Sequence, residues 1–178
     1  HMVAPRDSTQ GETMNIPPAL QFLLRPVPVW AVQRTAQSAY ARVMERHRGI
    51  FQRLGEHAGK TFAFAPTDIP FEFAVRPAEA RISVARPGRI LRYDARISGP
   101  ILLLLALAEG RVDGDAEFFG RQLAIDGDME AVLALRNALD DTRIDFTEDL
   151  APRNGPLRRP VSAGLRAARH AALARRRT

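Results

Sequence analysis

The side chains that could do chemistry in this sequence are few and scattered. Two of its four histidines, His47 and His57, lie ten residues apart with no carboxylate pattern beside them, so their spacing does not predict a metal site. Lys60 lies at an expected helix-to-strand turn, where nothing in the sequence predicts a shifted pKa. Cysteine is absent, which excludes iron–sulfur ligands, thiolate zinc sites and cysteine nucleophiles. We therefore expect no resident metal or cofactor.

Paired carboxylates occur at 113–117 and at 126–130, in segments that resemble the start of a calcium-binding loop. The glycine required at the sixth loop position would fall on Phe118 or Ala131, so both segments are predicted to be turns followed by helix caps. The sequence has no glycine-rich phosphate loop, and no serine has the flanking glycines of a nucleophile elbow. An enzyme needs a convergent set of such groups, so we predict a protein that is not an enzyme.

The strongest pattern is apolar. Residues 101–108 are eight apolar residues in succession, whereas an amphipathic surface helix keeps a polar face. As a helix this run would span roughly 12 Å, which is too short for a bilayer core of about 30 Å. The run must therefore be surrounded, either as plain core or as the wall of an apolar cavity. Periodicity alone cannot separate these two interpretations.

The elements that position this run begin with helices. Residues 16–28 contain four prolines, so only a short helical piece is expected there, at 19–24. From Val29 onward, apolar residues recur at spacings of three, four and seven, which predicts one long helix or two helices separated near Gly49.

Strands follow, because apolar and polar residues then alternate, with one apolar and one charged face. This pattern predicts an antiparallel meander with one solvated face, on whose apolar face the later helices pack. We therefore predict an α/β (α+β) fold with about five mostly antiparallel strands covered by helices. The expected strands lie at 62–64, 69–76, 81–86, 91–97 and 123–125, and the expected helices at 101–109, 116–121 and 129–140.

The charge is concentrated at one end. The net charge is +6, yet the residues from Arg153 onward contain eight arginines and no acidic residue, so the preceding part is net negative. A basic tail on such a domain predicts a polyanionic neighbour, which is a membrane surface, nucleic acid or an acidic protein. The tail residues predicted to bind a membrane or another anion are Arg158, Arg159, Arg166, Arg169, Arg175, Arg176 and Arg177.

Composition divides the chain into three parts. Residues 1–15 are expected to be a tag remnant and a disordered N-terminus, and residues 16–150 a single domain preceded by a helical leader. Residues 151–178 are expected to form a proline- and glycine-containing linker and a basic C-terminal helix. Cysteine is absent and no stretch of about 18 apolar residues occurs, so we expect a cytoplasmic protein, peripheral to the inner membrane.

Several motifs together resemble one known family. They are Ala58-Gly59-Lys60-Thr61-Phe62 after the leading helix, Glu109-Gly110 at the end of the apolar run, and Phe-Phe-x-Arg-x-Leu-x-Ile-x-Gly-Asp from Phe118 to Asp128. Over about residues 16–145 the chain is similar to the sterol carrier protein 2 (SCP2) domain. Together with Leu-Leu-Arg-Pro-Val-Pro at 23–28, these motifs most resemble the UbiT group, which are accessory factors of oxygen-independent ubiquinone biosynthesis.

The resemblance implies an SCP2-like lipid-binding domain whose curved sheet and helices enclose an apolar tunnel. It implies ubiquinone, its polyprenylated precursors or phospholipid as the ligand. It implies hydroxylase proteins of the UbiU and UbiV type and other quinone-biosynthesis enzymes as partners. Iron–sulfur clusters of such an assembly must belong to those partners, because this chain has no cysteine.

The apolar pattern itself supplies the candidate cavity residues. They are Phe71, Phe73, Ile82, Tyr93, Ile97, Leu103, Leu107, Phe118, Phe119, Val132, Leu135 and Leu139. The function we predict is sequestration or presentation of a lipid or isoprenoid quinone, without catalysis. Nucleic-acid binding or protein interaction through the basic tail is an alternative hypothesis, and a small hydrolase is a weaker one that lacks a nucleophile.

Overall fold

The computed structural model describes residues 15–110, 122–142 and 144. The helix expected at 116–121, the linker and the arginine-rich tail lie outside these residues. The α-helices are α1 (Pro18–Leu24), α2 (Val29–Arg46), α3 (Gly49–Leu54), α4 (Ile101–Ala108) and α6 (Met129–Thr142). The strands are β1 (Phe62–Pro66), β2 (Glu72–Arg76), β3 (Arg81–Ala85), β4 (Ala95–Gly99) and β5 (Ala124–Gly127), and short 3₁₀ helices occupy Gly55–Gly59 and Pro77–Glu79.

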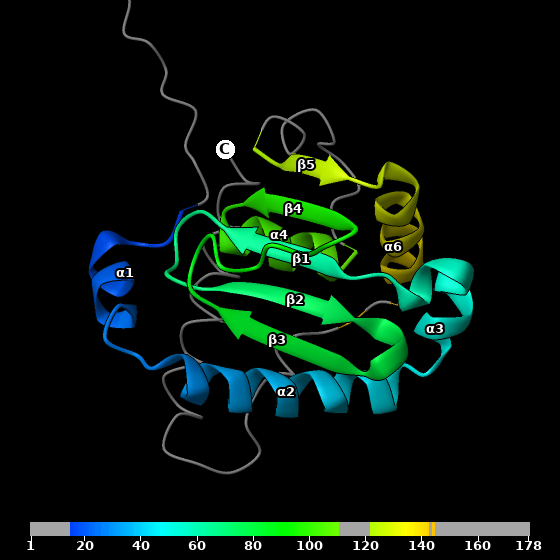
Figure 1. The fold of residues 1–178 in the computed structure, drawn as a ribbon, viewed down its shortest axis with the longest axis horizontal. Helices are drawn as coiled ribbons and strands as arrows, with labels where there is room; N and C mark the ends of the chain where they lie inside the picture. Colours follow the sequence, from blue (N-terminus) through cyan, green and yellow to red (C-terminus); the bar gives the residue numbers. More distant parts are fainter. Residues whose placement is uncertain (1–14, 111–121, 143, 145–178) are drawn as a thin grey trace, which may run out of the picture.

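The five strands form one sheet in the order β3-β2-β1-β4-β5 (Figure 1). Three neighbouring pairs are antiparallel, which confirms the expected mostly antiparallel sheet. A simple meander is wrong, however, because β4 lies parallel to β1, with Phe64 opposite Ile97. Residues 91–93, expected to open a strand, belong instead to the connection that crosses in front of the sheet from β3 to β4 (Figure 1).

The register divides the sheet into two faces of different chemistry. Residues paired across neighbouring strands lie on the same face, and successive residues alternate between faces. The dry face therefore carries Phe62, Phe64, Phe73, Val75, Ile82, Val84, Ala95, Ile97 and Ile125. The wet face carries Glu72, Arg76, Arg81, Ser83, Arg96 and Asp126. The predicted segregation of apolar and charged residues between the faces is confirmed.

Helices cover part of the dry face. In Figure 1, α4 lies behind the sheet, and α3 and α6 stand together at one end of it. Their buried side chains join those of the sheet in one core cluster, which includes Leu54 of α3, Phe62 and Ile97 of the sheet, Leu104 of α4 and Leu135 of α6. Burial of these side chains is the main favourable term for folding.

Helix α2 runs along the outer edge of β3, where two glutamines take the place of a missing strand. Gln33 accepts from the Val84 N–H at 2.6 Å and donates to the Ile82 carbonyl at 2.7 Å. Gln37, one turn later, accepts from the Ile82 N–H and donates to the Ala80 carbonyl, both at 3.0 Å. An open edge invites pairing with another chain, so these amides close one edge of the sheet.

Candidate functional site

Five of the residues predicted to line a cavity lie together at one end of the dry face. Ile97, Val132, Leu135 and Leu139 belong to the buried core cluster, and Leu107 packs against it. At these positions the described residues pack against one another as ordinary core. The sequence pattern identified these residues correctly as interior, and their role as a wall stays a prediction.

Over β2 and β3 the dry face is less completely covered. Phe73 and Ile82, also predicted to contact a ligand, are half-buried, as are Phe64 and Val75 on the same face. We name these four side chains the dry-face strip. An interior sheet face normally hides its phenylalanines, so the strip is apolar surface that the described helices leave partly open.

Helix α4, like the dry-face strip, has apolar side chains that are only partly buried. All eight of its residues are apolar, yet only Leu103 and Leu104 are buried. Leu102 and Leu105 are half-buried, although an apolar helix normally buries its whole circumference. The strip and this helix are the elements of the described chain that could shelter an apolar ligand.

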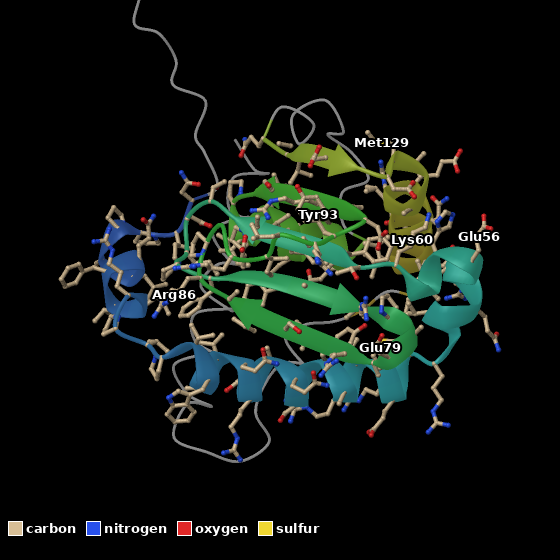
Figure 2. All side chains as sticks on the ribbon, viewed as in Figure 1. Glu56, Lys60, Glu79, Arg86, Tyr93 and Met129 are labelled. Atoms are coloured by element: carbon tan, nitrogen blue, oxygen red, sulfur yellow. The ribbon has the colours of Figure 1, made fainter. Side chains whose placement is uncertain are left out.

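Three further predicted residues lie elsewhere. Phe71 is buried just before β2, with the Arg86 guanidinium 4.7 Å from its ring centre, and Leu103 is fully buried within α4. Tyr93 does not join them, because its hydroxyl donates to Asp126 Oδ2 on the wet face at 2.8 Å. Figure 2 shows Tyr93 in front of the sheet, opposite to α4. Phe118, Phe119 and the seven tail arginines lie outside the described residues.

The hollow beside Tyr93 is polar. It has a volume of about 640 Å³ and opens widely to solvent. Its lining residues are Thr61, Ala74, Arg76, Arg81, Ser83, Leu91, Arg92, Tyr93 and Asp94. Three guanidinium groups make this hollow unsuitable for a hydrocarbon tail, because their desolvation would not be compensated. The apolar tunnel expected from the sequence therefore remains a prediction.

Lys60 does have a shifted pKa, contrary to the expectation from sequence. Its ammonium group donates to Asp128 Oδ2 and lies 2.9 Å from Nδ1 of His57. The hydrogen bond to Asp128 raises the pKa of Lys60, and the same bond, with the Ala131 N–H, lowers the pKa of Asp128. Both groups are therefore held in their charged forms, which suits a structural pair and not a nucleophile or a general acid.

Asp128 also performs the capping role predicted for it. Its Oδ1 accepts from the Ala131 N–H at 3.0 Å, in the first turn of α6. A carboxylate at this position satisfies a free N–H and interacts favourably with the helix dipole. Within residues 15–110, 122–142 and 144, no group of three or more metal-ligating side chains occurs.

Two buried carboxylates were missed by the sequence reasoning. Glu72 accepts from Arg96 Nη2 at 2.9 Å and from the Ile90 N–H at 2.6 Å, which fastens the β3–β4 connection to the wet face. Asp68 accepts from the N–H groups of Ile16 and Ile101, at 3.0 and 2.8 Å. The signal available in the sequence was an acidic residue within an otherwise apolar segment, which requires a partner if it is buried.

The match to known families decides how this arrangement is classified. The model of the SCP-2 sterol transfer family matches residues 42–140, which is more than half of the chain. The chain belongs to this family. The expected SCP2-like fold is thereby confirmed, with the sheet, α4 and most of α6 inside the matched region and α1 outside it.

Two solved structures are similar to this chain. A structure described as "UbiJ-SCP2 Ubiquinone synthesis protein" aligns with a TM-score of 0.51 and 14% identity, covering 67% of this chain and 98% of its own. Sterol Carrier Protein 2 from Yarrowia lipolytica, in its apo form, aligns with a TM-score of 0.43 and 10% identity, covering 64% of this chain and 94% of its own. At these identities the likeness concerns the fold alone. No curated protein matches the chain.

The chain therefore contains an SCP2 lipid-binding domain. None of the described helices is both long and apolar enough to cross a bilayer. Half-buried apolar side chains that a lipid could contact lie on the dry-face strip and on α4.

Proposed function

We propose that this protein is a non-catalytic accessory factor of ubiquinone biosynthesis, which holds an isoprenoid quinone or its polyprenylated precursors. The observation that carries the proposal is the half-exposed apolar surface of an SCP2 domain, made by the dry-face strip and α4. Apolar area shielded from water contributes about 25 cal/mol per Å², so a polyprenyl tail gains most of its binding energy from such a surface.

The choice of a quinone over another lipid rests on two similarities. The neighbour with a TM-score of 0.51 is described as a ubiquinone synthesis protein. The motifs at 23–28 and 118–128 resemble the UbiT group, whose members serve the oxygen-independent pathway. On this basis we propose UbiU- and UbiV-type hydroxylases as partners that act on the bound intermediate, while this chain supplies shelter and delivery.

The ligand can be tested by extraction. The purified full-length chain is extracted with organic solvent, and the extract is analysed by mass spectrometry for quinones, polyprenylated phenols and phospholipids. We expect a stoichiometric isoprenoid species. If the extract contains only phospholipid, the lipid-binding role is retained and the quinone role is rejected. If the extract contains no lipid and the protein also fails to bind added quinone, both roles are rejected.

A matched pair of variants tests where the ligand lies. Ile82 and Ser83 are adjacent in β3 but lie on the dry and wet faces, respectively. We expect Ile82→Asp to lose bound quinone and Ser83→Asp to keep it, because only the first places a charge on the dry-face strip. Val75→Thr, which is nearly isosteric, provides a milder change at the same surface if Ile82→Asp fails to fold. Equal quinone content in all three variants would contradict the proposed location.

The proposed place of action is the surface of the inner membrane. The arginines of the tail at 158–178 would each contribute up to about 1 kcal/mol beside an anionic leaflet, less at high salt. Flotation with anionic liposomes, with and without residues 158–178, measures this contribution. Equal flotation of the two chains would remove the tail from the proposal. If the chain with residues 158–178 retains more nucleic acid in a filter-binding assay than the chain without them, and salt reduces this difference, nucleic-acid binding through the tail is favoured instead.

A further inference from the structure

Large apolar side chains on α1 and at the start of α2 are exposed to solvent, and nothing in the described chain covers them fully. The exposed fractions are 46% for Leu20, 70% for Phe22, 65% for Leu23 and 67% for Trp30. No residue of α1 is buried. In Figure 1, α1 stands at one end of the sheet, beside the N-terminal end of α2. We call these four residues the α1 patch.

The two half-buried residues of α1, Gln21 and Leu24, lie on the same side of the helix. Gln21 donates to the Ile16 carbonyl at 3.1 Å, and Leu20, Phe22 and Leu23 spread over roughly 160° on the other side of the helix. Four large apolar residues exposed within eleven positions are unusual for a surface with no partner, because scattered single residues are the norm.

Both ends of α1 are fastened to the domain. Before it, Ile16 is buried and donates its N–H to Asp68 at 3.0 Å. After it, Arg86 donates to the carbonyls of Val27 and Arg25, at 2.8 and 3.3 Å, while its guanidinium also stacks on Phe71. The patch is thus presented by a fixed helix and not by a free chain end.

The charged residues in this part of the sequence have one sign. Between residues 15 and 44 the chain has three arginines, Arg25, Arg34 and Arg42, and no acidic residue. A short helix with aromatic and leucine side chains beside arginines has the composition of an interfacial segment, in which the apolar side enters the acyl boundary and the cations meet anionic headgroups. Tryptophan is itself enriched at this depth of a bilayer.

We propose that the α1 patch docks the protein on an anionic lipid bilayer, with Phe22, Leu23 and Trp30 inserted at the interface. Helix α1 has seven residues, about 10 Å in length, so it lies in one leaflet and does not cross it. The patch precedes the region matched by the SCP-2 family, so this docking surface lies outside that region. It extends the proposed peripheral location and requires neither the quinone nor the arginine tail.

The chain carries its own reporter for this contact, because Trp30 is its only tryptophan. The full-length protein is mixed with vesicles of phosphatidylcholine and phosphatidylglycerol, and with vesicles of phosphatidylcholine alone. We expect a blue shift of Trp30 emission and quenching by brominated lipids with the anionic vesicles, and a weaker response with the neutral ones. Binding without a change in Trp30 emission would overturn the proposal, since the contact would then lie elsewhere.

Matched variants separate the patch from general hydrophobicity. Phe22→Ser and Leu23→Ser should each weaken partition into anionic vesicles by roughly tenfold, because each removes an inserted side chain. Leu91→Ser is the control, since Leu91 is 82% exposed but lies in the β3–β4 connection. Unchanged partition of both patch variants overturns the proposal. The proposal is also overturned if the protein does not bind vesicles but self-associates, and if Phe22→Ser and Leu23→Ser abolish that self-association. The patch would then be the contact surface for a second copy of the chain.

Discussion

Removal of the buried carboxylate of Glu72 should destabilise the fold severely. Glu72 is 2% exposed and neutralises Arg96, whose side chain is 22% exposed. The change Glu72→Ala removes the acceptor of the Ile90 N–H and the charged partner of the guanidinium, which keeps a contact of 3.5 Å to the Ile90 carbonyl, in a region that water reaches poorly. Breaking a buried ion pair by removing one partner costs about 3–5 kcal/mol. That is a large share of a typical total of about 5–15 kcal/mol.

The effect is measured as a melting temperature by far-ultraviolet circular dichroism. For a chain of this size, 1 kcal/mol corresponds to about 2–4 °C, so the melting temperature should fall by about 6–20 °C. Glu79→Ala is the matched control, because Glu79 also pairs with an arginine, at 2.7 Å, but its side chain is 46% exposed. An exposed pair contributes about 0–1 kcal/mol, so the control should melt within a few degrees of the wild type.

A double change provides a second check of the reasoning. If the cost of Glu72→Ala arises from the stranded charge, then Glu72→Leu combined with Arg96→Leu should be less destabilised than Glu72→Ala alone. The account is refuted if Glu72→Ala and Glu79→Ala lower the melting temperature equally, because burial would then make no difference to the pair.

Three other perturbations follow from local geometry. Gly127→Ala should cost at least about 3 kcal/mol in urea denaturation, because the backbone has φ +90° and the new Cβ would lie 2.3 Å from the Asp94 carbonyl oxygen. Asp128→Asn keeps a cap on α6 but loses the charge. Lys60 lowers the pKa of Asp128, so the ionised carboxylate stabilises the fold at neutral pH, and this contribution is lost as the pH falls through about 4 and below. The variant should therefore be less stable than the wild type at neutral pH, and its stability should depend less on acid pH. Gln37→Leu should cost about 1–3 kcal/mol and promote concentration-dependent association through the freed edge of β3, as followed by gel filtration.

Each of these has a control in the same chain. A Cβ at Gly59 would meet nothing within 4 Å, so Gly59→Ala should be nearly neutral, and an equal loss at both glycines would contradict the clash. If the stability of Asp128→Asn falls with acid pH as much as that of the wild type, the titrating group is not Asp128. Gln52→Leu changes an exposed glutamine of α3, and association of that variant to the same extent would mean that the edge of β3 is not responsible.

Local patterns in the sequence determined much of what the structure contains. The alternation of apolar and polar residues in the strand region predicted the dry and wet faces. The apolar run predicted a helix at 101–109, which ends one residue after the observed α4. Asp128 was recognisable as a cap from its place before an apolar repeat, and the motifs around it led to the family. These properties depend on residues near one another in the chain, so their spacing is sufficient evidence.

Only the tertiary structure decided which segments meet. The meander expected from the sequence is broken because the connection after β3 crosses the sheet and brings β4 parallel to β1. The partners of Gln37, Glu72 and Asp68 lie at least 18 residues away in the chain, so no local period reveals them. The exposure of Phe22 and Trp30 was equally undetermined, because apolar residues in a leader can be buried or exposed with the same spacing, and only their fixed position beside the sheet leaves them facing solvent.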